Sequence, residues 1–369
     1  MHEGRSIDQE RDDRARLDQR IRQQARALGF DVVAVARADE PIDTDHRRYQ
    51  EFVAAGMHGD MAFLADQAAS RRSLDCEDIL IGARSVVCLG KRYARPDDGA
   101  DGIVPLIARY ARGRDYHNFV KKRLRKLAVF VRHLTPGAEA RALCDTEPLL
   151  ERAWSARAGL GFVGKNGMVI TPGMGSYVML GEVVTNLELV PDTPIAERCG
   201  SCTRCLDACP TQAFPRPFVL DARKCISYLT IEASGAPAEE LRAPSAEHLF
   251  GCDVCQEVCP FNRTAPPPIE RTRDFAPLEE HRARTLTDVV TMDEATWDAA
   301  TLGTPLRRPK RAGLARNAAL VAANRARAGA ATEDDRRCLE AASAHEDAAV
   351  REVAAWGLAA ARDGDTKDT

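Results

Sequence analysis

CGSCTRCLDACP, residues 199–210, and GCDVCQEVCPFN, residues 251–262, are the stretches that decide the fold of the middle of this chain. The first run spaces its cysteines as C-x2-C-x2-C-x3-C-P, and the second as C-x2-C-x3-C-P. Cys225 stands between the two runs. Eight of the chain's twelve cysteines therefore gather in one region, which indicates a shared set of ligands.

The first run has the spacing with which bacterial ferredoxins hold two [4Fe–4S] clusters, and there the fourth cysteine binds the other cluster. We therefore expect one cluster on Cys199, Cys202, Cys205 and Cys259, and a second on Cys209, Cys225, Cys252 and Cys255. The alternative is a pair of structural zinc sites, which also use Cys-x2-Cys. Zinc sites usually pair cysteines two by two and do not require a third at equal spacing, so clusters are favoured.

The compartment follows from what surrounds the cysteines. The first twenty residues, MHEGRSIDQERDDRARLDQR, are charged and contain no apolar stretch of a secretory signal. No apolar run approaches the roughly 20 residues that a membrane span needs. In a reducing cytoplasm, cysteines are metal ligands or free thiols more often than disulfides. We therefore expect a cytoplasmic protein without a membrane partner.

The 369 residues, 44% apolar and 29% charged, suit a globular chain of two or three domains. We expect a disordered charged tail over 1–16, an α/β or α+β domain over 17–190, a ferredoxin-type domain over 191–268 and a helical domain over 269–369. The helical domain contains RAGLARNAALVAANRA and VREVAAWGLAAA, which resemble each other. That similarity favours a helical-repeat module, with a simple bundle as the alternative.

Periodicity predicts the individual elements. Helices are expected over 17–28, 119–134, 149–158, 314–328 and within 335–361, and strands over 31–36, 85–89, 168–170 and 177–189.

Three motifs outside the cysteines invite a chemical role. Gly159-x-Gly161-x-x-Gly164 matches the dinucleotide fingerprint, but it follows a helical segment instead of a strand, so we reject that interpretation. Asp145, in LCDTEP, is either a helix cap or a proton donor, and the two roles are compatible. RYARGRDYH, residues 109–117, mixes charge and aromatics with a possible acid–base histidine, or is a surface loop.

Two basic runs interrupt a chain whose net charge is −3. They are KKRLRK, residues 121–126, and RRPKRAGLAR, residues 307–316. Each is either a solvated helix face or a patch that contacts phosphates. The run at 307–316 is the candidate for nucleic-acid contact.

Together these residues resemble the epoxyqueuosine reductases, which complete queuosine synthesis in tRNA. The resemblance covers nearly the whole chain, and its most specific part is CDTEPLLERAWSARAGLGFVGKNGMVITPGMGSYVMLGEVVTN, residues 144–186. It also includes residues 109–117, both cysteine runs and LDARKCISYLTIE, residues 220–232.

The resemblance implies a cobalamin between the α/β domain and the cluster domain, fed with single electrons by the clusters. It implies removal of the epoxide oxygen of epoxyqueuosine at the tRNA wobble position, with Asp145 as proton donor. It implies HEAT-like C-terminal repeats that help to hold the tRNA. An external one-electron donor and a monomeric chain complete the expectation. The expected cobalamin contacts are Arg72, Ala108, Arg109, Asp145, Lys165, Asn166 and Val169.

Two positions depart from the family pattern. Asp75-Cys76 stands where Asp-Pro is usual, and Arg72 is the nearest candidate for the cofactor-side arginine. Gln212 replaces the more usual Gly after Cys-Pro-Thr, which we expect to be harmless.

Two other functions fit part of the pattern. One is another cobalamin/iron–sulfur reductase, such as a reductive dehalogenase, although those usually carry an export signal. The other is a non-catalytic electron-transfer subunit, which would need no cobalamin. Bound corrinoid separates the last from the other two.

Overall fold

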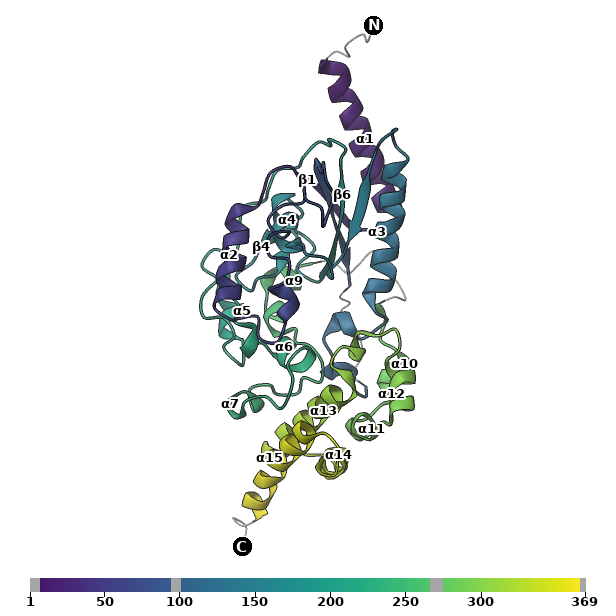
Figure 1. Cartoon of the computed structure of the whole chain (residues 1–369). Helices are drawn as coiled ribbons and strands as arrows, with labels where there is room; N and C mark the ends of the chain where they lie inside the picture. The colour runs from purple at the N-terminus through teal and green to yellow at the C-terminus, as the bar shows by residue number, and fades with distance from the viewer. Residues whose placement is uncertain (1–6, 94–100, 266–274, 366–369) are drawn as a thin grey trace.

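An antiparallel sheet lies at the centre of the computed structural model, which describes residues 7–93, 101–265 and 275–365 (Figure 1). Its strand order is β1-β2-β6-β3, and every neighbouring pair is antiparallel. The strands are β1 (Val32–Arg37), β2 (Ser85–Arg92), β3 (Ala140–Leu143) and β6 (Val178–Thr185). Of the two predicted classes, the domain is therefore α+β.

The sheet is covered on both faces, which explains why the stretch 86–89 of β2 is apolar throughout. Val87 and Leu89 face the layer that contains α1 (Ile7–Ala27) and α3 (Tyr116–Arg132). Val86 and Cys88 point the other way, into the core under α4 (Glu151–Arg157). Alternation along a strand sends successive side chains to opposite faces, so a strand covered twice needs apolar residues at every position.

The amino-terminal segment differs from its expectation. Residues 1–16 were expected to be a disordered tail, but α1 already begins at Ile7; residues 1–6 lie outside the described part. The helix extends because its apolar end is anchored, with Ile21 and Ala25 fully buried against the sheet. Arg14 also pairs with Glu188, which is distant in sequence, and Arg22 pairs with Asp18 on the same helix. Such ion pairs add a small amount of stability to a helix that is already anchored.

The other predicted strands and helices form close to their expected positions. The predicted strand 168–170 becomes β5 (Val169–Ile170), which pairs with β4 (Phe162–Val163). Gly161 is required there, because a Cβ would lie 2.5 Å from the carbonyl oxygen of Ile170. Gly159 turns the chain with φ +76°. These glycines thus serve the protein's own backbone packing.

The cysteine-rich region is irregular, with short helices between long loops. It contains α5 (Arg204–Asp207), α6 (Ile226–Ile231), α7 (Glu239–Arg242), α8 (Val254–Glu257) and α9 (Pro260–Arg263). The expected boundary at 268–269 falls within 266–274, outside the described residues. The segment between β1 and β2 holds α2 (Asp43–Ala54).

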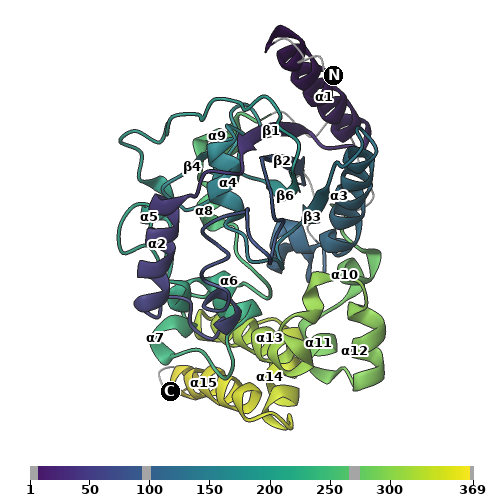
Figure 2. The same cartoon turned by 45° about the horizontal axis from the view of Figure 1, so that its top comes forward.

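Helices alone follow, at the end of the molecule opposite α1 (Figures 1 and 2). They are α10 (Glu279–Ala283), α11 (Leu286–Thr291), α12 (Glu294–Thr301), α13 (Lys310–Arg327), α14 (Glu333–Ser343) and α15 (Ala348–Asp365). Their apolar core is shared with Ile103–Ile107 and with Leu249 and Phe250. The helical end is therefore built onto the rest of the chain. In the part of the chain that is described, no helix is long and apolar enough to cross a membrane.

The contact between α3 and the sheet predicts a stability difference. Leu124 is fully buried, and it lies so close to Gly181 of β6 that a Cβ there would approach Leu124 to 2.5 Å. We expect Leu124→Ala to lower the free energy of unfolding by about 2–5 kcal/mol, through lost burial and the cavity left behind. Val129→Ala, on the same helix but 44% exposed, should change it by less than about 0.5 kcal/mol. Anaerobic urea unfolding followed by circular dichroism measures both; equal effects would contradict this packing.

Candidate functional site

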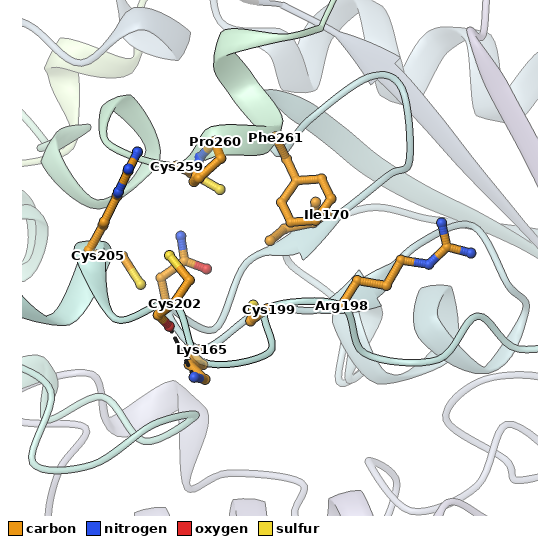
Figure 3. A pocket seen from close by; sticks show the side chains of 11 residues that line it. Lys165, Ile170, Arg198, Cys199, Cys202, Cys205, Cys259, Pro260 and Phe261 are labelled. Atoms are coloured by element: carbon orange, nitrogen blue, oxygen red, sulfur yellow. Dashed lines mark hydrogen bonds between the residues drawn. The ribbon is translucent and has the colours of Figure 1, made fainter.

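Four cysteines from the two separate runs surround one cavity of about 250 Å³ (Figure 3). Cys199, Cys202 and Cys205 come from the first run, and Cys259 comes from the second. Cys259 lies directly before α9, whose first residue is Pro260. The chain therefore turns away from the cavity immediately after this cysteine. The structure thus brings together the four residues expected to bind the first cluster.

The other four cysteines are also neighbours. Burial, together with the charges of Cys225 and Cys209, raises the pKa of the Cys252 thiol to about 12. Burial likewise raises the pKa of the Cys255 thiol, and the neighbouring charges of Cys252 and Cys225 contribute to the same rise. Cys205 of the first set also acts on Cys255, so the two sets adjoin.

The donor set suits a multi-atom cluster. In the ranges that the structure describes, no three His, Cys, Asp or Glu side chains are gathered closely enough to hold a single metal ion. The first four thiols instead stand around a space with room for several metal and sulfur atoms. Burial raises the thiol pKa values, so metal binding has to deprotonate these groups.

Four residues expected at the cobalamin contact the cysteine runs. The ammonium of Lys165 donates hydrogen bonds to the carbonyls of Gly200 (2.6 Å) and Cys202 (3.0 Å). The amide of Asn166 donates to the carbonyl of Cys255 at 3.3 Å. Lys165 and Asn166 therefore hold both runs against the β4–β5 hairpin.

A second connection joins the sheet domain to the run at 252–259. The backbone N–H of Ala108 donates to the carbonyl of Phe250 (2.8 Å), and that of Arg109 donates to the carboxylate of Asp253 (2.7 Å). Gly251, at φ +70°, allows this approach, because a Cβ would lie 2.6 Å from that of Ala108. The amides at 108 and 109 are thus engaged within the protein.

Two of the other three predicted contacts have different surroundings. Val169 is buried in the core under α4. Arg72 lies at the surface and pairs with Asp43, at the start of α2, at 2.6 Å. The buried arginine of this segment is its neighbour Arg71, whose guanidinium donates to the carbonyl of Phe63.

Asp145 has a backbone conformation of its own. Its φ is +62°, in the left-handed region that non-glycine residues seldom adopt, and such strain often accompanies functional positions. The helix-cap interpretation is wrong, because α4 is preceded by Leu150 and no side chain caps it. The Asp145 backbone N–H instead donates to Oε1 of Glu151 at 2.6 Å. The turn directs the carboxylate toward α3.

There the carboxylate meets His117, which sequence analysis marked only as a possible acid–base group. His117 Nε2 lies 2.8 Å from Oδ2 of Asp145, and Nδ1 lies 2.7 Å from Oδ1 of Asp115. Asp115 also caps α3 by accepting the backbone N–H of His117. Because both ring nitrogens face carboxylates, both act as donors when the ring is protonated.

Electrostatics place the proton on the imidazole. Burial alone would lower the pKa of His117, but the hydrogen bonds and charges of Asp115 and Asp145 outweigh it and raise the pKa to about 9. Burial would raise the pKa of Asp145, but the hydrogen bond and charge of His117 outweigh it and leave that pKa below its ordinary value. Asp145 is therefore ionised and His117 protonated at neutral pH.

The helical end contributes a cation to the same site, which the sequence did not indicate. The charge of Arg308 helps to lower the pKa of Asp145. Its guanidinium pairs with Glu232 at 3.0 Å and lies over the ring of Phe63, which is 48% exposed. A cation of the helical end thus acts on the carboxylate that His117 contacts.

The basic run at 307–316 is largely engaged within the protein. Arg307 pairs with Asp298, and Arg311 pairs with Glu294 and Glu346. Arg316 is buried and donates to the carbonyls of Leu229, Ala233 and Gly235. Most of the run is therefore paired within the protein: Arg307 and Arg311 bind acids of the helical end, whereas Arg308 and Arg316 join the helical end to the cluster region.

Gln212 has φ +50°. A left-handed backbone costs a residue with a Cβ roughly 1–2 kcal/mol, which explains why glycine is usual at this position. The replacement expected to be harmless therefore carries a backbone cost.

Comparisons with known proteins agree on one family. Residues 74–146 match a family model described as "Epoxyqueuosine reductase QueG, DUF1730", and residues 198–262 match a "4Fe-4S double cluster binding domain". The epoxyqueuosine reductase of Gloeobacter violaceus is 41% identical over 308 residues, covering 81% of this chain and 93% of that protein. That of Xanthomonas campestris is 38% identical over 348 residues, covering 92% and 95%.

Solved structures give the same result. A crystal structure of epoxyqueuosine reductase with an epoxyqueuosine-modified tRNA-Tyr stem loop has a TM-score of 0.79 at 26% identity, covering 94% of this chain and 99% of that one. The Bacillus subtilis enzyme, with the loop of a catalytic aspartate swung out of the active site, has a TM-score of 0.81 at 28% identity, covering 94% and 90%.

The two hydrogen bonds from Lys165 predict an effect on the first cysteine run. We expect Lys165→Met to speed the loss of iron to a chelator, because two charge-assisted hydrogen bonds, each worth about 1.5–3 kcal/mol, no longer hold the loop at 200–202. Lys122→Met, at an exposed position on α3, is the matched control. Iron and sulfide per chain, followed anaerobically against time, provide the measurement. Equal rates in the two variants would show that Lys165 does not secure the loop.

Proposed function

Because this chain belongs to the epoxyqueuosine reductase family and is an oxidoreductase with two [4Fe–4S] clusters, we propose that it reduces epoxyqueuosine in tRNA to queuosine, the last step of queuosine biosynthesis. The relatives named for this activity cover most of the chain, and they carry the proposal. A relative bound to an epoxyqueuosine-modified stem loop supports tRNA as the substrate.

We assign the clusters as the sequence suggested, to Cys199, Cys202, Cys205 and Cys259, and to Cys209, Cys225, Cys252 and Cys255. The grouping of the thiols around the cavity and beside one another supports this assignment. The adjoining sets would allow single electrons to pass between them.

We place a cobalamin at the junction between the sheet domain and the cluster region. The residues fit such a group, because the segments 108–109 and 165–166 both reach the run at 252–259, close to the second set of thiols. Ala108 offers a small apolar side chain, and Asp145 offers a polar one. Since the amides at 108 and 109 are already engaged, their contacts to a cofactor would come from side chains or carbonyls.

The reaction consumes two electrons and two protons, and turns an epoxide into an alkene and water. The clusters and cobalamin, when bound, supply the electrons. This chain's own residues supply the first of the two protons, because the departing oxygen is a poor leaving group without one, and the second proton comes from water. Asp145 is ionised at rest and cannot donate by itself. His117 therefore passes its proton across the 2.8 Å hydrogen bond to Asp145, which delivers it to the oxygen.

Asp145 stands on a turn that we propose can open. The left-handed φ of Asp145 costs free energy that only the surrounding contacts offset. In the Bacillus subtilis relative, the loop of a catalytic aspartate is swung out. Such a motion here would let the substrate enter before the acid closes over it.

The remaining partners follow the same reasoning. We propose that HEAT-like helices α13, α14 and α15 help to hold the tRNA, whose unstacked loop bases reach the surface beside Arg308 and Phe63. We further propose a monomer in the cytoplasm, 17–190 as the cobalamin domain, and an external one-electron donor.

Conversion of epoxyqueuosine-tRNA by the anaerobically reconstituted protein, with metal and corrinoid analysis, tests the whole proposal. Cluster-loaded protein without corrinoid or conversion would favour an electron-transfer subunit, and corrinoid without conversion would favour another reductase.

The acid predicts a clear loss of turnover. Asp145→Ala and Asp145→Asn should each keep both clusters and corrinoid but lose about 10²–10⁴ in rate, the usual contribution of a general acid. The asparagine variant retains the shape of the side chain, so its loss isolates the proton. Single-turnover assays on epoxyqueuosine-tRNA measure the rate. Near-normal turnover in either variant would remove Asp145 from this role.

The proton on His117 predicts a pH profile. A histidine with a raised pKa is protonated below that pKa, so turnover should hold through neutral pH and fall as the pH rises past about 9. His117→Gln keeps a donor toward Asp145 but releases no proton, so its turnover should fall by about 10²-fold at pH 7. A pH profile of His117→Gln that coincides with that of the unsubstituted protein would show that His117 only orients the carboxylate.

A further inference from the structure

A second pair of carboxyl groups lies behind Asp145, and the reaction as proposed does not use it. Glu182 lies on β6, opposite Cys88 of β2 and Leu143 of β3, and its side chain enters the core under α4. It is 0% exposed. A carboxylate in such a place is costly unless donors surround it.

No donor within the described ranges reaches Glu182. Both of its carboxyl oxygens are buried without a hydrogen-bond donor. The polar group that it meets is another carboxyl, that of Glu151 on α4. Two carboxylates in contact repel each other, whereas one neutral and one ionised carboxyl share a hydrogen bond.

The surroundings favour one retained proton. Burial raises the pKa of Glu182, and the charge of Glu151 raises it further. Burial also raises the pKa of Glu151, and the negative charge of Asp145 is the second cause of that rise. Glu147 adds a third negative charge to both. Among the groups facing the pair, Cys88 and Cys144 are neutral buried thiols, and Arg152 supplies positive charge to Glu151.

Glu151 connects the pair to the proposed acid. Its Oε1 accepts the backbone N–H of Asp145 at 2.6 Å, at the residue with the left-handed φ. This hydrogen bond offsets the strain of the turn, so whatever fixes the Glu151 carboxyl also fixes the direction of Asp145.

We propose that Glu151 and Glu182 share a single proton, and that this pair, with Glu182 fully buried and Glu151 partly buried, locks the turn carrying Asp145 in the position seen here. This proposal rests on the proposed function in one respect, the role of Asp145 as the general acid. Glu182, in its neutral form, donates to Glu151, and Glu151 accepts from Asp145. Both are positioning residues, since neither touches the reacting atoms.

The lock has a pH dependence whose sign is determined by the raised pKa. A carboxyl with a raised pKa in the folded state holds its proton at neutral pH and loses it as the pH rises through that value. The two carboxylates then repel each other, Glu151 shifts, and the turn at 143–150 opens. One proton lost gives about a tenfold change in the opening equilibrium for each pH unit above the pKa.

Two measurements on the holoprotein test this lock. Infrared spectroscopy should show the C=O stretch of a protonated carboxyl at neutral pH, absent in Glu182→Gln and retained in Glu188→Gln, an exposed glutamate just after the same strand. Hydrogen exchange of the 143–150 peptide, divided by the rate of the same unstructured peptide, should lose protection as the pH rises above about 7, the raised pKa of Glu151. Glu182→Gln, which donates to Glu151 without a titratable proton, should lose no protection over that range.

The outcomes separate cleanly. A carboxyl band that survives Glu182→Gln, or a loop in that variant that opens with pH as in the unsubstituted protein, overturns the lock. Should Glu182→Gln fold poorly, Glu151→Gln serves instead, because its amide still accepts from Asp145 and donates to Glu182, and protection should again be independent of pH. Neither readout involves tRNA, so absence of epoxyqueuosine conversion with both results as expected would contradict the proposed function and leave the lock intact.

Discussion

The structure depends on one constraint, that the last cysteine of each run has to reach the set formed by the other run. Cys259 stands with Cys199, Cys202 and Cys205, whereas Cys209 stands with the second set. The chain between the runs must therefore return on itself. Short helices between long loops permit this, because each helix start redirects the chain and each loop carries a ligand. A region with so few regular hydrogen bonds needs support from outside.

That support comes from the sheet domain, through contacts that are mostly polar. Lys165 and Asn166 bind the carbonyls of both runs, and the amides of Ala108 and Arg109 bind the run at 252–259. Backbone carbonyls in irregular loops have no helix or strand partner, so side-chain donors satisfy them at little entropic cost once the hairpin is rigid. The residues that we propose as cobalamin contacts are thus also residues that join the domains.

The groups proposed to move the proton lie in a different environment from the cysteine runs. They form a partly buried row of acidic side chains with few cations nearby. His117 lies between Asp115 and Asp145, and its raised pKa stores a proton where an ionised carboxylate can collect it. Behind them, Glu182 lies in the core and Glu151 lies partly buried beside it, and burial favours the neutral acid. Arg308, reaching in from the helical end, balances part of this negative charge. Strand β6 and the start of α4 therefore position the turn that carries the proposed donor.

The sequence by itself determined the features that depend on local order: the cysteine spacing, the apolar strand at 85–89 and the periodicity of the helix at 119–134. It also identified Asp145, through a motif that specifies a family. Only the tertiary structure decided the partners of those residues. That His117 meets Asp145, that Glu182 meets Glu151, that Arg316 is buried and that residues 7–16 are helical all depend on segments far apart in the chain. Charge and burial act through space, so a run such as RRPKRAGLAR looks the same in sequence whether its charges face water or bind carbonyls inside the protein.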